Sequence, residues 1–206
     1  GWMRWCRRVS GSHRVMPVRT DNRPMRRAGR SKDLAAASYS DGGRTRTLHL
    51  GGTAWVQGTM RLDRPFDIDL DYVQRMMAWL LFVEPDEVPE RHALQLGLGA
   101  AAITKFCHQR LRMHTTAVEI NPEVVAACRH AFHLPPDDER LQVELADAAE
   151  YLARSDVVAS ADAIQADLYD AQADRPVLDT PDFYAACRRA LRDGGVLTVN
   201  LFGGRA

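Results

Sequence analysis

Short apolar runs alternate with helical patterns through the second half of the chain. Apolar residues recur at helical spacing between these runs, which lie at residues 93–96, 117–120, 141–145, 161–166 and 196–202. Two parallel strands need a crossover connection, so strands that alternate with helices predict a mostly parallel sheet with helices on both faces. The pattern therefore predicts a Rossmann-like α/β fold, in which ligands bind at the carboxyl ends of the strands.

A strand pattern of another kind precedes this region. Residues 44–57 alternate in polarity on either side of the pair Gly51-Gly52, which predicts a small N-terminal β-hairpin. Apolar residues at helical spacing over 72–82 then predict a helix whose apolar stripe belongs to the core. A linker over 84–91, with two prolines, leads to the first parallel strand.

The charge of the chain is unevenly distributed, although its formal sum is zero. Residues 1–46 contain twelve Arg or Lys and three Asp, a net charge of +9, which leaves −9 for the remainder. This segment has few apolar residues and no regular period, so we expect a mostly disordered basic arm. Aromatic side chains accompany the basic ones only at Trp2 and Trp5, so nucleic acid is not an expected partner. The predicted organisation is an arm (1–42), a hairpin plus helix (43–90) and a Rossmann-like domain (91–206).

Other features of the sequence argue against membrane, secreted and metal-binding classes. The longest apolar run, 76–83, has eight residues, whereas a membrane span needs roughly 20. Arg7 and Arg8 interrupt the early apolar residues, so we expect no secretory signal and a cytoplasmic protein. The four cysteines show no paired spacing, and His130 and His133 have no third ligand nearby, so neither a disulfide nor a metal site is expected.

Two glycines end the first parallel strand. Gly97 and Gly99 lack a Cβ, so the backbone can turn sharply and approach a ligand, while the helix that begins near Ala100 presents free N–H groups. Glu119 follows 22 positions after Gly97, at the end of the second strand, where a carboxylate can accept both hydroxyl protons of a ribose. These residues favour nucleoside binding. A plain strand-to-helix turn with a solvated acid remains open on the glycines alone.

Carboxylates also follow the third and fourth strands. Asp147 comes directly after 141–145, and Asp167 and Asp170 come after 161–166. A scatter of surface acids would show no such preference for strand ends, so the set favours a binding site at that edge of the sheet. Two carboxylates three positions apart can attract an alkyl ammonium and take its proton, although Asp170 could equally cap a turn.

Several longer motifs resemble one known family. They are Val56-Gln-Gly-Thr-Met60, Leu96-Gly-Leu-Gly99, Ala117-Val-Glu-Ile-Asn-Pro122, Ala146-Asp-Ala148, Asp167-Leu-Tyr-Asp170 and Pro176-Val-Leu-Asp-Thr-Pro181. Together, over residues 44–206, they are similar to the spermidine synthases, the polyamine aminopropyltransferases. The resemblance implies a small β-strand domain before a methyltransferase-type Rossmann-like domain, a role in polyamine biosynthesis, decarboxylated S-adenosylmethionine as donor and a polyamine such as putrescine as acceptor.

The resemblance also implies a role for each candidate residue. Glu119 would hold the ribose, Asp147 would lie beside the adenine, and Gln57 would border the nucleoside from the hairpin. Asp167 would be the catalytic base, and Asp170 would help to hold the amine.

The chain departs from the family pattern at the glycine-rich turn. Leu98, Ala100 and Ala101 replace a glycine, an acid and a further glycine. The family's acid meets the ammonium of the donor, so its loss leaves ordinary S-adenosylmethionine open as an alternative. Residues 168–171 also lack the usual small hydroxyl residues and proline, which indicates a different acceptor pocket.

Three further expectations follow. A methyltransferase or a non-catalytic relative that binds an S-adenosyl nucleoside is the main alternative. A nicotinamide dehydrogenase also matches Gly97-x-Gly99-x-x-Ala102 with Glu119, but acids at 147 and 167 disfavour it. Family members continue into a hairpin beyond the fifth strand, whereas this sequence stops at Ala206, so we expect a truncated domain whose edge strand favours a homodimer.

Overall fold

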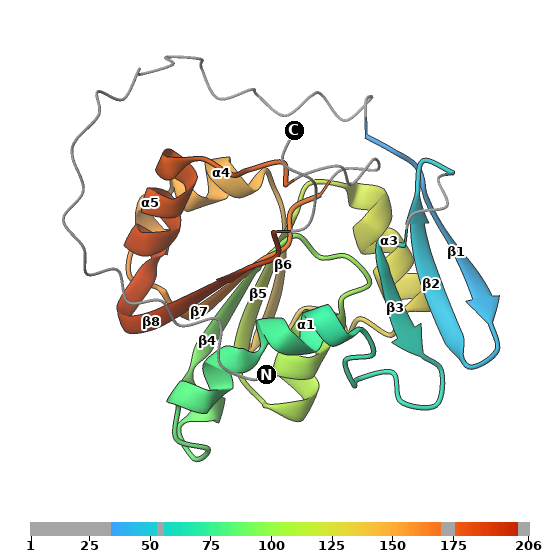
Figure 1. The fold of residues 1–206 in the computed structure, drawn as a ribbon, viewed down its shortest axis with the longest axis horizontal. Helices are drawn as coiled ribbons and strands as arrows, with labels where there is room; N and C mark the ends of the chain where they lie inside the picture. Colours follow the sequence, from blue (N-terminus) through green and yellow to red (C-terminus); the bar gives the residue numbers. More distant parts are fainter. Residues whose placement is uncertain (1–33, 53–55, 170–175, 202–206) are drawn as a thin grey trace, which may run out of the picture.

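Five parallel strands form the central sheet of the protein. The computed structural model describes residues 34–52, 56–169 and 176–201. The strands are β4 (His92–Leu96), β5 (His114–Glu119), β6 (Leu141–Leu145), β7 (Ala161–Ala166) and β8 (Leu191–Val199), in the order β6-β5-β4-β7-β8 (Figure 1). The chain leaves β4 toward one edge and returns to its other side with β7, and this reversal creates a crevice at the strands' carboxyl ends. The predicted parallel sheet is confirmed.

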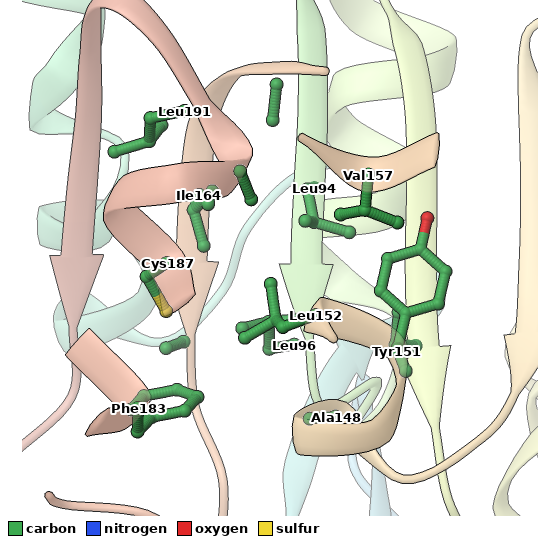
Figure 2. Packing of buried hydrophobic residues seen from close by; sticks show 14 residues of the cluster. Leu94, Leu96, Ala148, Tyr151, Leu152, Val157, Ile164, Phe183, Cys187 and Leu191 are labelled. Carbon is green, nitrogen blue, oxygen red and sulfur yellow. The ribbon is translucent and has the colours of Figure 1, made fainter. Parts of the chain in front are cut away.

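Helices cover both faces of this sheet, as predicted (Figure 1). On one face, α4 (Ala148–Leu152) and α5 (Pro181–Ala190) pack against β4 and β7. Figure 2 shows this core, in which leucines of β4 and an isoleucine of β7 meet aromatic and aliphatic side chains of the helices: Leu94, Leu96, Ile164, Tyr151, Leu152, Phe183 and Cys187. On the other face lie α2 (Ala102–Lys105), which continues as a π-helical turn, and α3 (Pro122–Ala131).

The N-terminal element is a three-stranded antiparallel sheet and not a single hairpin. Its strands are β1 (Ala37–Gly42), β2 (Thr45–Leu50) and β3 (Gly58–Arg61), in that order. β1 lies inside the segment predicted as a disordered arm, so the predicted boundary at residue 42 is wrong, whereas residues 1–33 lie outside the described structure. Most of β1 is exposed and pairs with β2 over six positions, so backbone pairing forms it and no hydrophobic pattern marks it in the sequence.

A helix connects this small sheet to the large one. The predicted helix over 72–82 is α1 (Asp71–Met76) followed by a 3₁₀ helix, Ala78–Phe82. Val73, Met76 and Trp79 are buried as expected, but Phe82 is 73% exposed because the tighter 3₁₀ turn rotates it away from the core. Across the described ranges, no helix combines the length and the apolar character that crossing a membrane would require.

The small sheet docks on the large one beside the carboxyl ends of the parallel strands. Arg46 donates from Nη1 to the carbonyl of Ala131 at 2.7 Å, and the backbone N–H of Ala37 donates to Glu123 Oε2 at 2.9 Å. These bonds fasten β2 and β1 to the two ends of α3. The small sheet therefore forms a wall beside the crevice of the parallel sheet.

Candidate active site

A cavity of about 470 Å³ opens at the carboxyl ends of the parallel strands. Residues at or just beyond the end of each of the five strands line it, among them Gly97, Glu119, Asp147, Asp167 and Asn200. Gly99 and Gln57 also line it, so the structure brings together six of the seven candidate residues from the sequence. Asp170, the seventh, lies outside the described residues.

The glycine turn has its shape because other backbone segments approach it closely. Gly97 has φ of +88°, and an added Cβ would lie 2.2 Å from the carbonyl oxygen of Asp167. Gly99 has φ of +51°, and its Cβ would lie 3.1 Å from the carbonyl of Gln57. Ala101 also takes a left-handed conformation, with φ of +58°, which costs an alanine about 1 kcal/mol. The glycines therefore admit the segment that directly follows β7 and the residue that precedes β3.

Both oxygens of Glu119 accept backbone hydrogen bonds, one of them from the glycine turn. Oε2 accepts from the N–H of Leu98 at 2.9 Å, and Oε1 accepts from the N–H of Asn121 at 2.8 Å. Burial raises the pKa of Glu119, and these backbone donors oppose that rise. The side chain is thus a fixed acceptor at the tip of β5, and its remaining lone pairs can receive hydroxyl protons.

Asp147 lines the cavity and also caps a helix. Its Oδ1 caps α4 by accepting from the N–H groups of Ala149 at 2.8 Å and Glu150 at 3.1 Å. Capping holds the carboxyl group in one orientation, so Oδ2 can meet a ligand. Substitution of Asp147 would accordingly disturb both the helix and the cavity.

Asp167 is held by two neutral hydrogen-bond donors. Asn200 Nδ2 donates to Oδ1 at 2.9 Å, and the hydroxyl of Tyr72 donates to Oδ2 at 3.3 Å. Burial raises the pKa of Asp167, while these two donors lower it. In the described part of the chain no Lys, Arg or His forms an ion pair with Asp167. Its charge therefore stays available for a cation or a proton.

The sequence did not reveal Tyr72 and Asn200 as site residues. Tyr72 belongs to an apolar helical stripe and is 95 positions from Asp167, and Asn200 is 33 positions away. An amide in the run 196–202, which is otherwise apolar except for Thr198, was the available signal for Asn200. No signal marked Tyr72, because its hydroxyl reaches the site only when α1 packs over the ends of β7 and β8.

The charge of the cavity limits what it can bind. Its described lining contains the carboxylates Glu119, Asp147 and Asp167, with aliphatic walls, and no Lys, Arg or His. Cationic ligands are favoured, and phosphate or carboxylate groups are disfavoured. The described residues also bring no three His, Cys, Asp or Glu together in a way that could hold a metal ion.

Solved structures identify the class of fold. The chain superposes on a probable spermidine synthase from Corynebacterium glutamicum with a TM-score of 0.64 and 19% identity, covering 82% of this chain and 61% of that one. It also superposes on human methyltransferase-like protein 13, solved in complex with SAH, with a TM-score of 0.56 and 22% identity, covering 63% of this chain and 64% of that one. The protein therefore has the methyltransferase-type Rossmann-like fold.

Sequence comparison identifies the family. The model of the spermine/spermidine synthase domain matches residues 97–200. A polyamine aminopropyltransferase of Neisseria meningitidis serogroup A is 35% identical over 183 residues, which cover 88% of this chain and 67% of that protein. The chain belongs to the spermine/spermidine synthase family, whose members are transferases, and the predicted resemblance is confirmed. It spans about two thirds of that relative's length.

Proposed function

We propose that this protein transfers an aminopropyl group from decarboxylated S-adenosylmethionine to a polyamine such as putrescine. The observation that carries the proposal is the charge of the cavity, which has three carboxylates and no basic side chain in its described lining. The sulfonium and ammonium of the donor and the amine of the acceptor are all cationic. Ordinary S-adenosylmethionine would place a carboxylate in this negatively charged cavity, and a dinucleotide would place a pyrophosphate there. Both groups are anionic and are therefore disfavoured.

The nucleoside would lie across the ends of β4, β5 and β6. Glu119 would accept the ribose hydroxyl protons, and Asp147 would lie on the adenine side. Gly97 would allow the backbone to approach the ligand. Gln57 would border the nucleoside on the side of the small sheet. All four residues line one cavity, which supports this placement.

Asp167 would be the base of the transfer step. An alkyl amine has an ordinary pKa of about 10.4, so it arrives protonated and must lose a proton before it can attack. Asp167 takes that proton. The nitrogen lone pair then forms a bond to the methylene carbon next to sulfur, the carbon–sulfur bond breaks, and its electron pair neutralises the sulfonium to a thioether. The raised pKa of Asp167 makes it a stronger base. Asp170 stays a candidate for holding the amine.

Product analysis with two donors tests this function. The chain is incubated with putrescine and either decarboxylated or ordinary S-adenosylmethionine, and the products are measured by mass spectrometry. We expect 5′-methylthioadenosine and spermidine in equal amounts from the decarboxylated donor. A methylated amine formed from the ordinary donor, or the absence of any thioether product, would overturn the proposal. A homodimer and a cytoplasmic location stay predictions that other measurements must test.

A further inference from the structure

Two buried glutamines lie side by side at the centre of the parallel sheet. Gln95 of β4 is in register with Gln165 of β7, and the two residues are 4% and 0% exposed. Their neighbours along the two strands are apolar and equally buried: Leu94, Leu96, Ile164 and Ala166. A side-chain amide in such a position lowers stability unless its polar atoms have hydrogen-bond partners. The partners of this glutamine pair therefore need to be accounted for.

The protein itself supplies few of these partners. The hydroxyl of Thr104, on α2, donates to Gln95 Oε1. Neither Oε1 nor Nε2 of Gln165 has a hydrogen-bond partner among the residues that the structure describes. Inside a protein, an ordered water molecule commonly satisfies a buried polar group of this kind. The glutamine pair therefore indicates a site for water.

The proposed catalytic base lies one layer above the glutamine pair. The N–H of Asp167 donates to the carbonyl of Leu96 at 2.9 Å, so the parallel ladder continues one residue beyond β7. Because side chains alternate along a strand, Asp167 and Gln165 lie on the same face of the sheet, roughly 6.6 Å apart along it. One water molecule can bridge a glutamine amide and a carboxylate over that distance.

A small chamber reaches from the glutamine layer to the base. Its lining includes Gln95, Gly97, Asp167 and Tyr72, and its volume is about 20 Å³. It shares several lining residues with the main cavity, so water can enter it from there. The described lining offers an amide, a carboxylate and a phenol hydroxyl as polar partners, and no Lys, Arg or His. The chamber thus has the room and the polar groups that a bound water molecule requires.

We propose that the glutamine pair binds an ordered water molecule that donates a hydrogen bond to Asp167, and that Gln165 is thereby a positioning residue of the base. The inference rests on the proposed function, in which Asp167 takes the proton of the amine. The amide oxygen of Gln165 accepts one proton of the water, the carboxylate accepts the other, and the amide nitrogen of Gln95 donates to the water oxygen. The water acts as a third neutral donor beside Asn200 and Tyr72.

Gln165→Met tests this arrangement, because methionine has a similar length and lacks both amide atoms. The water then loses its acceptor, and the ionised carboxylate of Asp167 loses a donor that stabilises it. We expect the acid limb of kcat/KM to move to higher pH by roughly half a unit or more. Affinity for 5′-methylthioadenosine, measured by calorimetry, should not change.

Ile164→Met is the matched control. Ile164 is equally buried and adjacent in the sequence, but its side chain belongs to the core on the opposite face of the sheet. This variant should leave the acid limb in place, even if it lowers the melting temperature. An equal shift of the limb in both variants would assign the effect to packing of β7 and overturn the inference.

Gln95→Met supplies a second arm. It should move the acid limb in the same direction, because the two amides hold the same water. For that reason the double variant should shift the limb no further than the larger of the two single shifts. Full additivity of the two shifts would overturn the shared water.

A crystal structure of the unsubstituted chain with 5′-methylthioadenosine tests the site without catalysis. At high resolution we expect a water molecule within about 3.2 Å of Asp167 and of an amide of the glutamine pair. Absence of that water, or an unchanged acid limb in Gln165→Met, would overturn the inference. Failure of the unsubstituted chain to transfer an aminopropyl group would overturn the proposed function instead, whether or not the water is present.

Discussion

The two ends of the parallel sheet each hold a partly buried aspartate, but with partners of opposite kinds. At the amino end, the carboxylate of Asp162 accepts hydrogen bonds from Arg91 at 3.1 Å, from Arg192 at 2.7 Å and from the backbone N–H of His92 at 2.8 Å. At the carboxyl end, the side chain of Asp167 accepts hydrogen bonds only from the neutral side chains of Tyr72 and Asn200 among the described residues. The two acids lie on or directly after the same strand, β7.

The difference separates an acid that stabilises the fold from one that is available for chemistry. The charge of Asp162 is already compensated by two guanidinium groups, so it can do little more than hold β4, β7 and β8 together. The charge of Asp167 is uncompensated, and burial raises its pKa. An acid in that state destabilises the native protein until a cation or a proton reaches it.

The largest expected effect comes from Asp167→Asn. Turnover should fall by roughly 10² to 10⁴, the usual contribution of a general base, while affinity for 5′-methylthioadenosine stays unchanged. The melting temperature should rise at neutral pH. The pKa of Asp167 is higher in the folded protein than in the unfolded chain. Its contribution to stability is therefore fully present at a pH below the unfolded pKa and is lost as the pH rises through the folded pKa. Asparagine has no such charge to bury.

The matched control for this variant is Asp193→Asn, because the Asp193 side chain is fully exposed on β8 and 3.7 Å from Arg188. It should change neither turnover nor melting temperature. Undiminished aminopropyl transfer by Asp167→Asn at neutral pH would remove Asp167 from the role of base.

The same substitution at the other end of the sheet should have the opposite effect on stability. Asp162→Asn leaves Arg91 and Arg192 without their shared carboxylate. Because both guanidinium groups are partly exposed, we expect the free energy of unfolding to fall by only about 1 kcal/mol. For a domain of this size, that lowers the melting temperature by about 2–4 °C. Calorimetry measures the shift. A drop in nucleoside affinity beyond the loss of folded protein would contradict the division between the two ends.

The smallest expected effect is a shift in pH dependence. The donation from Asn200 lowers the pKa of Asp167, so Asn200→Ala leaves the effect of burial less opposed and raises that pKa further. The acid limb of kcat/KM should then move to higher pH, because more of the base is protonated at a given pH. Gln142→Ala, which removes an exposed amide on β6, is the control. An acid limb that does not shift would show that Asn200 does not affect the pKa of Asp167.

The sequence by itself determined the sheet and the position of the site. Alternating strands and helices predict parallel strands, and parallel strands share one direction, so residues that follow them meet at one edge. This is why the sequence alone groups Gly97, Glu119, Asp147 and Asp167. Gln57, which precedes β3 and also lines the cavity, was predicted only from the resemblance to the family.

Only the tertiary structure decided which acids are paired and which are not. Asp162 and Asp167 look alike in the sequence, and their partners come from residues 72, 91, 192 and 200, which no local pattern links to them. The same is true of β1, whose polar residues form a strand by pairing with β2, and of the contact between β3 and the glycine turn at Gly58 and Ala100. Periodicity records which face of an element is buried, whereas the partner of a side chain depends on how distant elements pack together.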